Sequence, residues 1–174
     1  ALKRQWELLK WLTCFVKLRL GSKVAGGLPR SHARRAAVQA LYQALVNGQA
    51  PTTKDALDFV SAENSDKMDQ KYFTTLVEGV SKELVTLDSE LAFAVDRSLS
   101  EIDPVESSVL RLAVYEFIHR PEVPYRVVLN EAVELAKAFG GEKGHRYVNG
   151  VLDKMGSKLR ADEYKASKAR RNNK

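Results

Sequence analysis

Apolar side chains recur at three- and four-residue steps along most of the chain, and this spacing is typical of amphipathic α-helices. Long runs that alternate Val, Ile or Thr with polar residues, as strands do, are missing. The pattern therefore predicts an all-α protein. The expected helices cover residues 29–48, 54–61, 68–96, 104–120, 124–140 and 144–159.

The clearest helix boundary is the sequence Asp103-Pro104-Val105-Glu106. The Asp103 side chain can accept a hydrogen bond from a backbone N–H, and Pro104 suits the first helical position. Glu106 can reach back to complete a capping box. We therefore expect a helix to begin at Pro104.

Three expectations concern the longer helical segments. Residues 68–96 exceed an ordinary helix, so we expect a break near residues 86–89. Residues 124–140 carry apolar side chains nearly all round, which predicts that this helix is the central and most buried one. Within the last helix, the alternative to a binding role for Asn149-Gly150 is a structural one, in which Gly150 allows a neighbouring helix to approach closely.

The two ends of the chain fall outside the helical domain expected over residues 29–160. Cations interrupt the apolar stretch in residues 1–28, so it is too broken for a membrane span, and no A-x-A cleavage pattern follows it. We interpret it as an N-terminal extension: an amphipathic helix for a membrane or partner, a translated leader, or a segment added by cloning. Residues 161–174 are expected to form a basic, disordered tail.

Charge is distributed unevenly along the chain, whose net charge is +6. Residues 1–35 contribute +8, residues 36–157 contribute −7, and residues 158–174 contribute +5. An acidic body with two basic ends is typical of a protein that binds a polyanion such as nucleic acid. The alternative is that the basic ends serve solubility alone.

The composition gives no support to catalytic or metal chemistry. The single Cys14 excludes an intramolecular disulfide and a cysteine metal site, and the three histidines are too scattered to propose a zinc site. No Gly-rich cofactor loop or catalytic constellation occurs. The sequence therefore predicts a non-enzymatic binding protein, without metal or cofactor, in a reducing, cytoplasmic setting.

Two stretches combine cations with aromatic side chains, as RNA-binding surfaces do. One stretch lies at the start of the last helix and contributes Lys143, His145, Arg146, Tyr147 and Asn149. The other is the first helix, which contributes Arg30, Arg34, Arg35 and Tyr42. Tyr42 lies within about 20° of Arg35 around the helix axis, so we expect both on one exposed stripe. Helix packing is the alternative role for Tyr42 and Tyr147, and a structural role for Asn149.

Several of these segments resemble a known family. They are ARRAAVQALYQ at residues 33–43, VLRLAVYEF at 109–117, VPYRVVLNEAVELAKAFG at 123–140 and HRYVNGVLDK at 145–154. In this order and spacing they resemble the transcription antitermination factor NusB family, over about residues 29–159. The resemblance implies a NusB-like fold of two packed three-helix bundles.

The resemblance also implies a function and its partners. NusB proteins bind the boxA element of nascent RNA, notably from ribosomal RNA operons, jointly with the ribosomal protein NusE. They do so within the RNA polymerase antitermination complex, with other Nus factors. Some members self-associate, so a homodimer is a further expectation.

Carried over to this chain, the family's RNA-contacting positions fall on the nine residues of the two cationic stretches. Ser31 and His32 occupy places where many members have more arginine, and Lys143 stands where some members carry an acid. The family's NusE-facing surface falls on Glu106, Arg111, Tyr115 and Glu116. For Glu106 the capping box is an alternative role.

Two other functions stay open on the sequence alone. NusB-like domains also occur fused to RNA methyltransferases that use S-adenosylmethionine, so the chain could be the RNA-binding module of such a system. Against this, the chain contains no Gly-rich cofactor loop. Residues 1–20 would instead suit a helical adaptor that binds a protein or a membrane.

Overall fold

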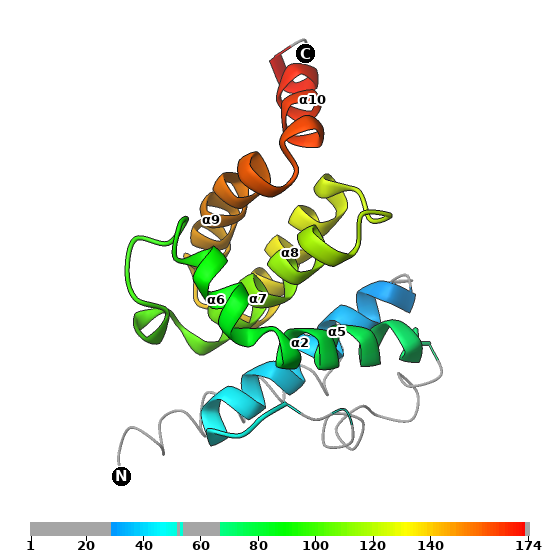
Figure 1. The fold of residues 1–174 in the computed structure, drawn as a ribbon, viewed down its shortest axis with the longest axis vertical. Coiled ribbons are helices and arrows are strands. Elements are labelled where there is room, and N and C mark those ends of the chain that lie inside the picture. The colour runs from blue at the N-terminus through cyan, green and yellow to red at the C-terminus, as the bar shows by residue number, and fades with distance from the viewer. Residues whose placement is uncertain (1–28, 52, 54–66, 173–174) are drawn as a thin grey trace.

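The structure, a computed structural model, describes residues 29–51, 53 and 67–172. Every regular element among these residues is helical, which confirms the all-α class, and none of these helices is long and apolar enough to cross a membrane. The expected extension at residues 1–28 and helix at residues 54–61 lie outside the described residues. The elements are α2 (Pro29–Asn47), α5 (Gln70–Lys82), α6 (Leu84–Leu91), the 3₁₀ turn η1 (Leu99–Glu101), α7 (Pro104–His119), α8 (Tyr125–Phe139), α9 (Gly144–Leu159) and α10 (Ala161–Asn172) (Figure 1).

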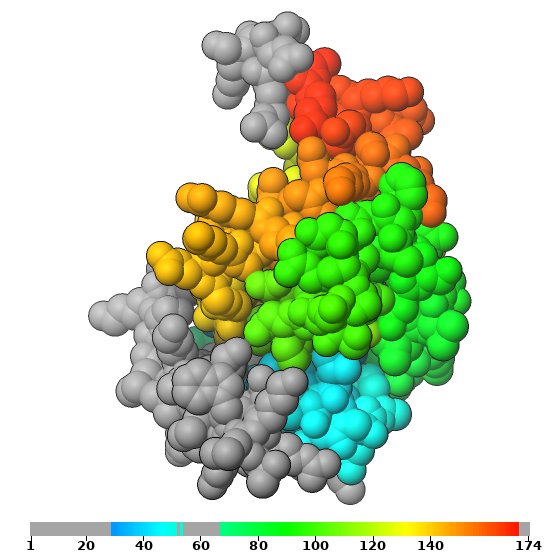
Figure 2. All heavy atoms as spheres, turned by 90° about the vertical axis from the view of Figure 1, so that its left-hand side faces the viewer, coloured from blue at the N-terminus to red at the C-terminus, as the bar shows by residue number. Residues whose placement is uncertain are grey.

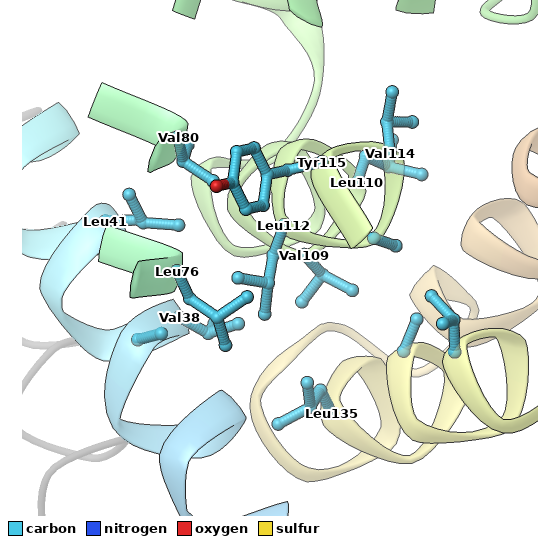
Figure 3. Close-up of a cluster of buried hydrophobic side chains, with 14 of the residues drawn as sticks. Val38, Leu41, Leu76, Val80, Val109, Leu110, Leu112, Val114, Tyr115 and Leu135 are labelled. Carbon is cyan, nitrogen blue, oxygen red and sulfur yellow. The ribbon is translucent and has the colours of Figure 1, made fainter. Parts of the chain in front are cut away.

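The helices form two groups that meet at α7. In one group α5 packs on α2 and α6, and all three contact α7; in the other, α8 and α9 pack on each other and on α7. Figure 3 shows Leu41 of α2 and Leu76 of α5 on one side of the cluster, Leu112 of α7 in the middle, and Leu135 of α8 beyond it. One continuous hydrophobic core therefore joins the two groups.

The most buried helix is α7, so the prediction that residues 124–140 hold this position is wrong. Twelve of the 16 residues of α7 are buried, against five of the 15 in α8. Helices cover α7 from both groups, and its buried polar side chains have partners. Arg111, for example, donates to Asp88 Oδ1 at 2.7 Å. An apolar count along the sequence cannot detect burial of this kind.

Local boundary signals place the helix ends correctly. Helix α2 begins at Pro29, and Gly48 follows its end with φ = 65°, a conformation that favours glycine. Asp103 Oδ1 accepts the backbone N–H of Val105 at 2.9 Å and caps α7, as predicted.

The long segment at residues 68–96 breaks earlier than expected. The break falls at Glu83, where α5 ends and α6 begins, and not near residues 86–89. Beyond the break, α6 turns Leu87 and Leu91 into the core, where both are fully buried. Helix α6 packs on α7 beyond the break.

The expectation of a disordered tail is also wrong, because α10 is a helix that packs on α8 and α9. Glu163 accepts the backbone N–H of Tyr125 at 2.7 Å, and Lys168 donates to Asp153 at 2.7 Å. The ring of Tyr164 meets that of Tyr125 edge-on, with 6.0 Å between centroids. Polar contacts hold much of α10, so its sequence lacks the apolar period that predicts a helix.

Candidate nucleic-acid interface

The loop between α8 and α9, with the first turns of α9, forms a cationic surface. Lys143, Arg146 and Asn149 are exposed there, and His145 and Tyr147 are partly exposed. No acidic residue lies in the first turn of α9, and Lys143 occupies its N-cap position. Figure 2 shows this segment, in yellow-orange, at the edge of one face of the molecule. Exposed cations beside the start of a helix attract phosphate.

Tyr147 is held by the segment that precedes η1. Its hydroxyl donates to Asp96 Oδ1 at 3.1 Å, and the guanidinium of Arg97 lies 5.2 Å from the centre of its ring. Arg97 itself donates to both carboxylate oxygens of Asp96, at 2.9 and 3.1 Å. The hydrogen bond from Arg97 lowers the pKa of Asp96 to about 2. The carboxylate therefore stays ionised at neutral pH, and the three side chains form one cluster.

Two arginines of α2 are further cations that reach the surface of the protein. Arg30 is exposed, 3.8 Å from Asp69, and its guanidinium lies 4.8 Å from the ring centre of Tyr72. Arg35 is partly exposed, and its guanidinium lies 5.1 Å from the ring centre of Phe139, the last residue of α8. Arg35 therefore sits where α8 runs into the loop that leads to α9. Of the two stretches that the sequence singled out, the first therefore reaches the end of α8 through Arg35.

Arg34 and Tyr42 are buried, so the expectation that they lie on the exposed stripe is wrong. Arg34 is 3% exposed and Tyr42 is 6% exposed. The guanidinium of Arg34 donates to Glu116 at 2.8–3.0 Å and to the Tyr72 hydroxyl at 3.2 Å. It also lies 3.6 Å from Glu131. Arg34 is thus an internal ion-pair partner, and Tyr42 belongs to the hydrophobic core.

Most of the residues expected to face NusE are also buried. Glu116 is 1% exposed and bound to Arg34, Arg111 is 8% exposed and bound to Asp88, and Tyr115 is 7% exposed. Their placement on an exposed surface is therefore wrong. Glu106 is partly exposed, and its carboxylate lies so close to Gly144 that a Cβ at this position would collide with it. Glu106 thus borders the cationic start of α9.

The sequence interpretation missed Asp96 and Arg97 as neighbours of Tyr147. Asp96 precedes Tyr147 by 51 positions, and no local pattern joins them. The signal available was the adjacent Asp-Arg pair at the end of the helix expected over residues 68–96. Among the described residues no group of three or more His, Cys, Asp or Glu could hold a metal ion.

The fold and this surface define a class: an all-helical protein with cations and aromatic side chains gathered at the start of one helix. Residues 31–157 match the NusB family, and the chain belongs to that family. A protein of Nitrosococcus oceani named transcription antitermination protein NusB is 48% identical over 142 residues, covering 82% of this chain and 95% of that protein. Its namesake from an Azoarcus species is 41% identical over 144 residues, covering 83% and 93%.

A solved structure supports the same fold assignment. The structure titled T. maritima NusB has a TM-score of 0.69 with 27% sequence identity, covering 79% of this chain and 97% of that one. The NusB-like fold is therefore confirmed. Membership of this family supports a non-enzymatic binding protein over the methyltransferase and membrane-adaptor alternatives.

Proposed function

We propose that the protein is a transcription antitermination factor that binds boxA RNA together with NusE. It would act in the cytoplasm on nascent transcripts, notably those of ribosomal RNA operons, within the RNA polymerase antitermination complex. The observation that carries the proposal is the contact of Arg35 with Phe139, which places this cation of α2 at the end of α8, before the loop that leads to α9. The names of the relatives support the same role.

The RNA-binding set that we propose leaves out the buried Arg34 and Tyr42. Its members are Arg30, Arg35, Lys143, His145, Arg146, Tyr147 and Asn149. The arginines and the lysine bind phosphates, and the counterions that they release make binding sensitive to salt. The aromatic members contribute to stacking surfaces for unpaired bases, and the Asn149 amide offers both a donor and an acceptor.

Glu106 is the residue that we propose for contact with NusE. It is partly exposed at the start of α7 and borders Gly144 at the start of α9. A basic partner bound at this carboxylate would lie beside the RNA, and each would then extend the surface offered to the other. Electrostatic complementarity of this kind also speeds encounter. Sequence selectivity would come from the composite surface.

The charge reversal Arg35→Glu tests the RNA surface. We expect it to weaken binding of boxA RNA at least tenfold, because it replaces a phosphate contact by repulsion, while binding of NusE stays unchanged. The matched control is Arg126→Glu, an exposed arginine about 20 Å along α8 from Phe139. Equal RNA affinity of Arg35→Glu and the parent in gel shifts at moderate salt would refute the assignment.

A second experiment tests the joint binding. Gel shifts compare boxA RNA with a scrambled RNA, each with and without NusE, for the parent and for Glu106→Lys. We expect NusE to raise the affinity of the parent for boxA selectively, and to have much less effect on Glu106→Lys. If NusE does not discriminate between the two RNAs, the proposed mechanism is wrong.

A further inference from the structure

The cluster of Asp96, Arg97 and Tyr147 has the geometry of a prepared stacking surface. Arg97 lies over the ring of Tyr147, with 5.2 Å from its guanidinium carbon to the ring centre. Asp96 accepts from the Nε and Nη2 atoms of Arg97 and from the Tyr147 hydroxyl, so one carboxylate fixes both of the others. These contacts hold the guanidinium plane in place before any ligand arrives.

Folding stability alone gives little reason for such an arrangement. The side chains of Arg97 and Asp96 are 51% and 59% exposed, and ion pairs this exposed contribute little to stability. Fixing a long arginine side chain also costs conformational entropy. An ordered, half-exposed guanidinium beside the cationic start of α9 therefore points to a ligand.

The electrostatics of the cluster indicate which part of a nucleic acid it suits. Asp96 offsets the charge of Arg97 and would repel a phosphate at close range. Its pKa is lowered to about 2 by the hydrogen bond from Arg97, so this negative charge persists at neutral pH. The uncharged face of a nucleobase meets no such repulsion, and guanidinium planes stack well on bases.

We propose that Arg97 and Tyr147 form a platform for one unpaired RNA base, which stacks on the guanidinium face turned away from the tyrosine ring. The platform rests on the proposed function, since it takes a base of the same RNA. Arg146, exposed in the same turn of α9 as Tyr147, supplies a cation for the phosphate of that nucleotide or its neighbour. Asp96 is a positioning residue that does not touch the RNA.

The test combines protein variants with abasic RNA. Arg97→Ala, Arg97→Lys and the control Arg126→Ala are titrated with boxA RNA and with a series carrying one abasic nucleotide at each position. We expect Arg97→Ala to bind the intact RNA about tenfold more weakly, as loss of one stacked base predicts. Arg97→Lys should lose nearly as much, because lysine keeps the charge and lacks the plane. Arg126→Ala should bind like the parent.

The abasic series locates the base. At one position the abasic RNA should bind the parent about tenfold more weakly, and there Arg97→Ala should cause no further loss. Circular dichroism and thermal melting check that each variant is folded. Full affinity of Arg97→Lys, or an equal loss with every abasic RNA, would overturn the platform.

The platform and the function on which it rests fail in different ways. A parent protein that binds no boxA RNA, with or without NusE, overturns the proposed function and the platform with it. If the parent binds boxA RNA and Arg97→Ala binds it equally tightly, the platform alone is overturned.

Discussion

A single buried arginine ties four helices together. Arg34 of α2 donates to Glu116 of α7 and to the Tyr72 hydroxyl of α5, and it lies 3.6 Å from Glu131 of α8. Burial and the neighbouring Glu116 carboxylate raise the pKa of Tyr72, so its hydroxyl stays protonated and hydrogen-bonds that carboxylate. A buried charge that has lost its partner is costly, so the cluster constrains how the two helix groups meet.

Arg34→Ala should lower the free energy of unfolding by about 3–5 kcal/mol, because it leaves the Glu116 carboxylate buried without its partner. The double variant Arg34→Met with Glu116→Leu should be less destabilised than Arg34→Ala, since neither charge is then left behind. Urea unfolding measures both. Arg30→Ala, on the same helix but exposed, should change the value by only about 0.5 kcal/mol. A parent-like urea midpoint for Arg34→Ala would contradict the structural role.

Two glycines of α9 offer a matched comparison. Gly156 faces the ring of Tyr125 so closely that a Cβ would collide with it, whereas no described atom lies within 4 Å of a Cβ at Gly150. The described residues therefore do not support the alternative in which Gly150 allows close helix approach, whereas Gly156 is a glycine of α9 that a neighbouring side chain approaches closely. Gly156→Ala should destabilise by about 1–3 kcal/mol through overpacking.

Gly150→Ala should instead stabilise by about 0.5–1 kcal/mol, because alanine restricts the unfolded chain and favours the helix. Thermal or urea unfolding of the pair separates the packing effect from helix propensity, which both substitutions share. Destabilisation by Gly150→Ala would indicate a neighbour at this position.

At the scale of the elements, local signals in the sequence predicted the start of α7. They did not predict the break between α5 and α6 or the presence of α10. Asp103 and Pro104 mark the start of α7 in sequence, and the structure confirms it. The break at Glu83 could not be predicted, because no proline marks it in the sequence. Helix α10 was missed since ion pairs such as Lys168 with Asp153 hold it.

Helix α10 also completes the start of α8. The N-cap of α8 is Pro124, whose side chain offers no cap, and Glu163 of α10 accepts the N–H of Tyr125 instead. Burial acts to raise the pKa of Glu163, but the Tyr125 N–H and Arg160 together lower it. At pH values above the ordinary pKa of a glutamate, a lowered pKa in the folded state contributes stability. This contribution is lost as the pH falls through the lowered pKa.

Glu163→Ala should therefore cost about 1 kcal/mol, as loss of a helix cap does, and should weaken the docking of α10. Hydrogen exchange is expected to speed up at the Tyr125 amide and along α10. Asp162→Ala, an exposed acid in the same turn, is the control and should leave the Tyr125 amide protected. The difference in hydrogen-exchange protection between the two variants should shrink as the pH falls through the lowered pKa of Glu163. Unchanged exchange in Glu163→Ala would show that α10 docks without this cap.

Over the whole molecule, the residue types in the sequence indicated the cationic segments of α2 and α9. Burial decides which side chains of these segments are exposed. Lys143, Arg146 and Asn149 are exposed as expected. Arg34 and Glu116 are buried because each is the other's partner across 82 positions, which no single-sequence pattern reveals. Arg97 was overlooked for the same reason, since its neighbour Tyr147 comes from a distant helix. Charged residues in one segment can thus serve the core or the ligand.

The division between phosphate and base contacts should appear in the salt dependence of RNA binding. Each lost phosphate contact lowers the slope of log affinity against log salt by about 0.7 for single strands. We expect this change for Lys143→Ala and Arg146→Ala, whose cations are exposed at the start of α9. Arg97→Ala should lower affinity with little change in slope, because Asp96 already offsets its charge. Filter binding over a salt series measures all three. A loss of about 0.7 from the slope in Arg97→Ala would mean that this arginine meets a phosphate.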